Sequence, residues 1–131
     1  MSKTKSVLIV TDGTDKIAKT ADNIAHALKG HKVLIKDASA FKGTDLLQAE
    51  AFFIGCEVPS PQSFAFFDEM LQHINLADRN CGIFSSSKKA AQYLAHMVKS
   101  SEAKLYPESL DDENPSVISK WAAMVIDQNG A

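Results

Sequence analysis

The chain has 131 residues, a formal net charge of -2, 45% hydrophobic residues and 23% charged residues. This is the size and composition of one ordinary globular domain, and it excludes a largely disordered or collagen-like chain. The mixed charges offer no basic surface for nucleic acid, and the apolar run near the amino terminus is far shorter than the ~18 residues of a membrane span. We therefore expect a single domain over residues 1–131, located in the cytoplasm, with no membrane or nucleic-acid partner.

Five short apolar runs have the length of buried strands and lie between segments of helical period. They are Ser6 to Val10, Lys32 to Ile35, Ala51 to Cys56, Cys81 to Phe84 and Ala103 to Tyr106. Parallel neighbours need a crossover helix, so strands that alternate with helices predict an open parallel sheet in an α/β fold.

The intervening segments place apolar residues on one face of a helix. The stripes are Ile17, Ala21, Ile24, Ala25 and Leu28; Phe67, Met70, Leu71 and Ile74 within Pro61 to Leu76; Ala90, Ala91, Leu94, Met97 and Val98; and Val117, Ile118, Trp121, Met124 and Val125. We expect Gly30 to end the first helix and Asn114-Pro115 to begin the last. The connection from Asp37 to Gln48 has room for about one or two turns.

In a doubly wound sheet, ligands bind outside the carboxyl ends of the strands, so three strand-to-helix turns carry the functional information. These turns are Thr11 to Asp15, Glu57 to Gln62 and Ser85 to Lys89. The first places hydroxyls and backbone N–H groups at a helix start, which suits an anion. It is equally typical of a tight turn in which Gly13 takes an unusual conformation and Thr14 or Asp15 caps the helix.

The stretch Val7-Leu8-Ile9-Val10-Thr11-Asp12-Gly13-Thr14-Asp15-Lys16-Ile17-Ala18 resembles the opening of flavodoxins, where a hydroxyl-rich Thr/Ser-x-Thr-Gly-x-Thr loop wraps the phosphate of FMN. Ala51 to Cys56 is similar to the family's third strand, and Leu110 to Trp121 resembles its acidic linker into a Trp-bearing helix. The resemblance covers nearly the whole chain. It implies a three-layer, doubly wound, five-stranded parallel sheet of flavodoxin-like order 2-1-3-4-5, and an FMN-binding electron-transfer protein with a redox partner protein.

The resemblance also implies a set of cofactor-binding residues and no catalytic ones. They are Thr11, Asp12, Gly13, Thr14 and Asp15 in the first turn, Glu57, Val58, Pro59 and Ser60 in the second, and Ser85, Ser86 and Ser87 in the third.

This sequence departs from the family in all three turns. The first is one residue shorter and sets the Asp12 carboxylate beside the phosphate position. The second lacks the aromatic residue and the glycine, and Pro59 and Pro61 fix its backbone. The third lacks the ring-stacking Tyr, since Tyr93 is expected on a helix surface. A domain that does not bind FMN, and serves in small-ligand binding or protein association, therefore stays open, as does another phosphorylated ligand.

Other chemistry is disfavoured. The four histidines have no metal-ligand spacing, so we expect no metal, and no Gly-x-Ser-x-Gly elbow indicates a hydrolase. A receiver domain would need an acidic pair after the first strand and an Asp ending the third, but only Asp12 and Glu57 are near those places. Cys56 and Cys81 are expected to be reduced structural thiols. Phe64 and Phe66 lie off the helical stripe and suggest a pocket or a homodimer face. An electron carrier or binding domain is favoured over an enzyme.

Overall fold

The computed structural model describes residues 4–40 and 42–128. Its centre is a five-stranded parallel sheet of order β2-β1-β3-β4-β5, as the resemblance implied. The strands are β1 (Ser6–Thr11), β2 (Lys32–Asp37), β3 (Ala51–Cys56), β4 (Asn80–Ser85) and β5 (Lys104–Leu105). The first four match the predicted apolar runs to within two residues at either end. The fifth is shorter than the predicted Ala103 to Tyr106.

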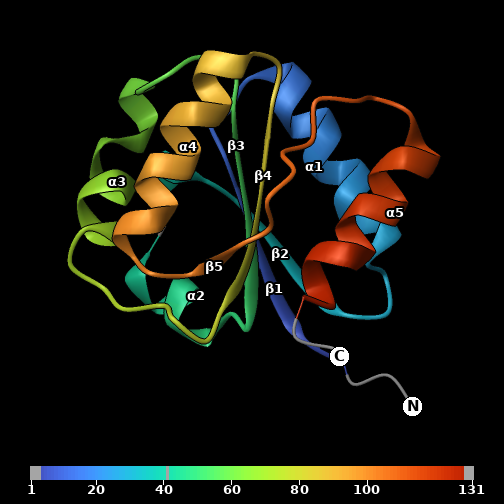
Figure 1. Ribbon diagram of the computed structural model, residues 1–131, viewed down its shortest axis with the longest axis horizontal. Coiled ribbons are helices and arrows are strands. Elements are labelled where there is room, and N and C mark those ends of the chain that lie inside the picture. The colour runs from blue at the N-terminus through green and yellow to red at the C-terminus, as the bar shows by residue number, and fades with distance from the viewer. Residues whose placement is uncertain (1–3, 41, 129–131) are drawn as a thin grey trace.

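Helices cover both faces of the sheet. Figure 1 shows α1 (Asp15–Ala27) and α5 (Pro115–Ile126) on one face, and α2 (Gly43–Gln48), α3 (Ala65–Leu71) and α4 (Lys88–Ser100) on the other. Every residue of β3 and β4 is buried, because these central strands are covered from both sides. On the α1 and α5 side the Phe53 and Trp121 rings pack with their centroids 5.4 Å apart.

Two helix boundaries differ from the prediction. Helix α1 ends at Ala27 with Leu28 as its C-cap at φ -104, so Gly30 does not provide the stop. The segment predicted as one helix from Pro61 to Leu76 is instead a 3-10 turn, η2 (Gln62–Phe64), followed by the seven-residue α3. The chain then leaves the helix because the Leu76 N–H donates to the Ser101 carbonyl at 2.7 Å, which draws it toward the start of β4.

The helical stripes are largely confirmed. Phe67 and Leu71 are buried, and Met70 and Ile74 pack against the same core. Helix α5 begins at the predicted Asn114-Pro115, with the Asn114 side chain accepting a hydrogen bond from the Ser116 N–H at 2.9 Å. Its predicted stripe is too wide: Ile118, Trp121 and Val125 are buried, whereas Val117 and Met124 are 41% and 49% exposed.

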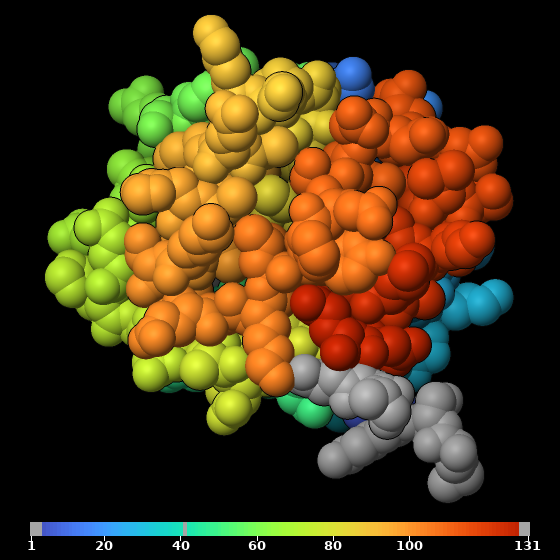
Figure 2. All heavy atoms as spheres, viewed as in Figure 1, coloured from blue at the N-terminus to red at the C-terminus, as the bar shows by residue number. Residues whose placement is uncertain are grey.

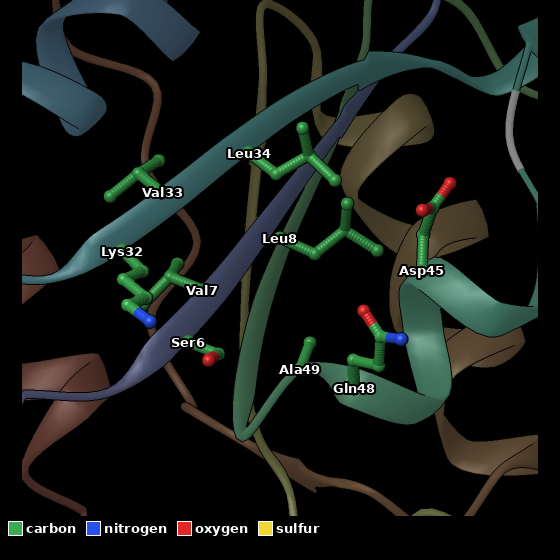
Figure 3. A pocket seen from close by; sticks show the side chains of 9 residues that line it. All are labelled: Ser6, Val7, Leu8, Lys32, Val33, Leu34, Asp45, Gln48 and Ala49. Carbon is green, nitrogen blue, oxygen red and sulfur yellow. The ribbon is translucent and has the colours of Figure 1, made fainter.

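The β2 edge of the sheet is thinly covered. The connection after β2 holds a 3-10 turn, η1 (Ala38–Ala40), and the six-residue α2, as its short length predicted. A groove of about 410 Å³ therefore remains between α2 and the amino-terminal halves of β1 and β2. Figure 3 shows Leu8 and Leu34 reaching from neighbouring strands towards Asp45 and Gln48 of α2. The groove lies at the opposite end of the strands from the three predicted turns.

The other edge is closed by irregular chain. Beyond the short β5, the Ser85 N–H donates to the Leu110 carbonyl at 2.9 Å, and the Leu110 N–H donates to the Ile83 carbonyl at 3.0 Å. These bonds continue the pairing of β4 without a formal strand. Figure 2 shows the segment between β5 and α5, in orange, filling the space between α4 and α5.

We predict that Gly82→Ala lowers the free energy of unfolding by about 1–3 kcal/mol, because a Cβ there would lie 2.9 Å from both Trp121 Cη2 and Val125 Cγ2 in a packed layer. The matched control is Gly30→Ala, where a Cβ would meet nothing within 4 Å. Urea denaturation of both variants measures the difference. Equal stability of the two would contradict the packing described for α5 against β4.

Candidate functional site

The three predicted turns meet where the strand order reverses, at the carboxyl ends of β1, β3 and β4. We call this region the mouth, and define it by the turns 11–15, 57–62 and 85–89. Thr11 and Ser85 are buried at its base, and Asp12, Thr14 and Glu57 are half-buried. The exposed predicted site residues are Gly13, Asp15, Val58, Pro59, Ser60, Ser86 and Ser87.

The Asp12 carboxylate ties the first turn to the second. Its Oδ1 accepts hydrogen bonds from the Thr14 N–H at 3.0 Å and from the Thr14 hydroxyl at 2.7 Å. Its Oδ2 accepts the Glu57 N–H at 2.8 Å, across 45 residues of sequence. We call this set of three hydrogen bonds the Asp12 bridge. It fixes the separation between the ends of β1 and β3.

The bridge leaves the start of α1 without a side-chain cap. Thr14 is the N-cap residue, but its hydroxyl donates to Asp12 and makes no bond to the first turn of the helix. The long helices α4 and α5 differ, since Ser87 accepts from the Ala90 N–H and Asn114 from the Ser116 N–H. Thus neither predicted cap for α1, Thr14 or Asp15, has a described capping bond, and the first-turn N–H groups lie at the mouth.

Gly13 lets a second carboxylate approach the turn. Its φ is +83, a conformation that favours glycine. A Cβ on this residue would collide with Asp37 Oδ2. Asp37 ends β2, and its Oδ1 accepts the Ser39 N–H at 2.9 Å and the Ser39 hydroxyl at 2.8 Å. Sequence reasoning did not include Asp37 in the site, although its place at the end of a strand beside β1 was an available signal.

The Glu57 peptide joins all three turns. While the Glu57 N–H donates to Asp12, the Glu57 carbonyl accepts from the Ser87 hydroxyl at 3.3 Å. Ser87 in turn accepts from the Ala90 N–H at 3.1 Å and so caps α4, as one interpretation of the sequence predicted. The second turn does begin a helical element at Pro61, but as the 3-10 turn η2. The mouth is therefore held by one continuous chain of hydrogen bonds.

The apolar side of the mouth is small. Val58 is 55% exposed, and no aromatic residue occurs in the three turns. Tyr93 is more enclosed than a helix-surface residue: its hydroxyl donates to Asp68 Oδ2 at 3.0 Å. Burial and this hydrogen bond raise the pKa of Tyr93. Tyr93 is thus engaged with Asp68 of α3 and with Ser60 of the second turn, rather than free to stack on a ligand.

The two phenylalanines that lie off the helical stripe, Phe64 and Phe66, differ in burial. Phe64 is fully buried and packs edge-on against Phe67, with the ring centroids 5.7 Å apart, so its prediction as a pocket or dimer residue is wrong. Phe66 is 54% exposed and lines a groove of about 460 Å³ with Leu47 and Met70. The difference arises because η2 turns Phe64 inward just before α3 begins.

The space beside α1 is tight and acidic. A crevice of about 10 Å³ lies between Lys16, Ser85, Ser86 and the loop 111–113, which brings three carboxylates next to the mouth. Pockets that enclose a cofactor are typically several hundred Å³. A flat ligand at this mouth would consequently lie on its open side, over the turns at 57–60 and 85–87.

Buried thiols accompany the site. Cys56 ends β3, and burial together with the Asp12 carboxylate raises the pKa of its thiol to about 12. Burial also raises the pKa of Cys81. Both cysteines are free.

In residues 4–40 and 42–128 no group of three or more His, Cys, Asp or Glu side chains is placed to hold a metal ion. No helix in those ranges has the length and apolar character to cross a membrane.

Solved structures of known proteins share the fold of this chain. No family model matches the chain, and no curated protein matches it. Among solved structures, it is similar to a short-chain flavodoxin associated with a PDU bacterial microcompartment, with a TM-score of 0.84, 14% identity, and coverage of 98% of this chain and 100% of the other. Flavodoxin 2 from Bacillus cereus has a TM-score of 0.81 and 19% identity, with coverage of 94% of this chain and 99% of the other. A flavodoxin from Streptococcus pneumonia has a TM-score of 0.79 and 18% identity, with coverage of 94% of this chain and 98% of the other.

These values show that the chain has the flavodoxin-like fold. At such low identity they show the fold alone.

We predict that neither cysteine reacts with a thiol reagent at about pH 8 in the native protein. With a pKa near 12, about one Cys56 side chain in ten thousand is a thiolate at that pH, and burial blocks access. Both thiols should react at once in concentrated guanidinium chloride. Rapid release of one equivalent of dye from the folded protein would show that the end of β3 is open or that the thiol is activated.

Proposed function

We propose that this protein binds FMN at the mouth and transfers electrons to and from a redox partner protein. The observation that carries the proposal is the start of α1: its first turn has no side-chain cap from Thr14 and follows the positive-φ Gly13 at the switch point of the sheet. Uncapped N–H groups at a helix start, with the helix dipole behind them, favour an anionic group such as a phosphate. The flavodoxin-like fold supports the choice of FMN as the phosphorylated ligand.

The residues present fit both ends of FMN, although with fewer contacts at the ring. The first turn of α1 would supply N–H donors for the phosphate, while the space beside Gly13 is taken by the Asp37 carboxylate. Val58 and the turn at Ser85 to Ser87 would flank the flavin ring, with Val58 as the exposed apolar surface. When bound, FMN would supply the electron-transfer chemistry, and the protein would position and tune it. The Glu57 peptide would hold the surrounding turns in place.

A second candidate function is favoured by a specific observation. The three turns contain no aromatic side chain to stack on a flavin, and the carboxylates of Asp12 and Asp37 stand beside the proposed phosphate position. Stacking on an aromatic ring contributes about 0.5–1.5 kcal/mol beyond buried area. A domain of this fold that binds another small ligand, or a protein, without FMN would need neither feature. The two candidates differ in one measurable property, which is uptake of FMN.

We predict that the purified, ligand-stripped protein quenches FMN fluorescence with a dissociation constant on the order of 0.1–10 μM and that FMN raises its melting temperature. Val58→Ser should weaken FMN binding about five-fold, because it removes roughly 1 kcal/mol of apolar contact with the ring.

The matched control is Val117→Ser, the same change at a 41% exposed position on α5 outside the mouth, which should bind FMN as the unaltered protein does. If no quenching and no thermal shift occur up to tens of micromolar FMN, the proposal fails and the second candidate function stands.

A further inference from the structure

We infer that Asp12 is a specificity-determining residue: its carboxylate occupies the Thr14 donors of the turn after β1 and its charge repels a phosphate, so the N–H groups at the start of α1 hold the phosphate of FMN less tightly than they would without that charge. The inference rests on the proposed function and defines its ligand class more narrowly. It predicts that removal of the Asp12 charge strengthens FMN binding more than riboflavin binding.

The first step is the count of donors. A carboxylate group offers about four acceptor positions, and the Asp12 bridge fills three of them with the Thr14 N–H, the Thr14 hydroxyl and the Glu57 N–H. Two of these donors belong to the turn that follows β1. A phosphate entering that turn would find the Thr14 donors already bound to a group of its own kind, an oxygen anion.

The second step is charge. Asp12 carries a negative charge within the turn, and Asp37 Oδ2 lies against Gly13 on its other side. A phosphate monoester dianion would sit near both. Unit charges a few ångströms apart repel appreciably even where water partly screens them, and a dianion doubles the effect. The helix dipole and Lys16 offset part of this repulsion, while the flavin ring, which is uncharged, is not subject to it.

The third step is that the Asp12 bridge ties the first turn to the second from within the chain. A bound phosphate can tie the first turn to its surroundings, but here the Asp12 carboxylate does so from within the chain, reaching Glu57 directly. The Ser63 hydroxyl also donates to the Asp12 carbonyl at 3.4 Å. Because the turn is ordered by its own side chain, phosphate binding adds little order to it.

The experiment compares FMN and riboflavin with the unaltered protein and Asp12→Asn. Asn keeps an oxygen that accepts from Thr14 and removes the charge, while its NH2 group cannot accept the Glu57 N–H. We expect Asp12→Asn to tighten FMN binding about tenfold or more and riboflavin binding less than about threefold. Asp22→Asn, the same change on an exposed residue of α1 about two turns beyond its start, is the control and should alter neither affinity.

Melting temperatures with and without inorganic phosphate, at constant ionic strength, provide a readout that needs no flavin. Phosphate should stabilise Asp12→Asn more than the unaltered protein. Asp12→Ser, which keeps a hydroxyl acceptor in the turn, repeats the test if the Asn variant folds poorly.

The outcomes separate the two proposals. Equal changes in FMN and riboflavin affinity on loss of the Asp12 charge would overturn the role of Asp12 while leaving flavin binding intact. If no variant binds either flavin, the proposed function fails, and the phosphate measurement decides for Asp12: a larger thermal shift in Asp12→Asn supports the role, and equal shifts refute it.

Discussion

The bond between Asp12 Oδ2 and the Glu57 N–H organises the functional end of this molecule. The strands β1 and β3 are neighbours in the sheet, but their following turns diverge to opposite faces, towards α1 and α3. Nothing in the sheet pairing itself fixes the two turns relative to each other. The Asp12 carboxylate accepts hydrogen bonds from both turns and so fixes their relative position. The Ser87 hydroxyl, which donates to the Glu57 carbonyl, links the turn after β4 to the same set of bonds. This chain of bonds therefore positions Thr14, Glu57 and Ser87 relative to one another.

The mouth and the β2 edge of the sheet are stabilised in different ways. At the mouth, side-chain hydrogen bonds satisfy polar backbone groups that lie beyond the last strand residues. At the β2 edge the problem is apolar area: α2 has six residues, and Leu34 remains 44% exposed beside the groove of Figure 3. Lys32 and Lys36 on the same strand keep its free edge charged, which discourages pairing with another strand. The exposed apolar area on this side therefore does not by itself indicate that β2 pairs with a strand of another molecule.

Most of the fold was predictable because it depends on periodicity, which is local. Buried parallel strands read as continuous apolar runs, and β3 matched its predicted run residue for residue. The errors lie where a tertiary contact overrides the pattern, as when the Leu76 N–H pairs with Ser101 and ends α3 early. Of the site, sequence placed the three turns correctly at one edge. It did not foresee the Asp12 bridge, because the partner N–H lies 45 residues away and a backbone donor leaves no trace in the residue type at position 57. Asp37 was missed for a similar reason, since its contact with Gly13 depends on strand order.

The rigidity of the second turn bears on the electron transfer that we propose. The Glu57 N–H and carbonyl are both engaged, and Pro59 and Pro61 hold their own φ angles near -65°. A peptide in this turn therefore has little freedom to rotate and offer a different group to a bound ligand. If a flavin is held here, its oxidised and reduced forms meet the same backbone groups, and their difference in binding must come from the charge of the surroundings. Those surroundings are rich in carboxylates, at Asp12, Asp37 and the loop 111–113. Because negative charge disfavours adding electrons to a ligand, the same Asp12 that limits phosphate recognition would also lower the reduction potential of a flavin bound beside it.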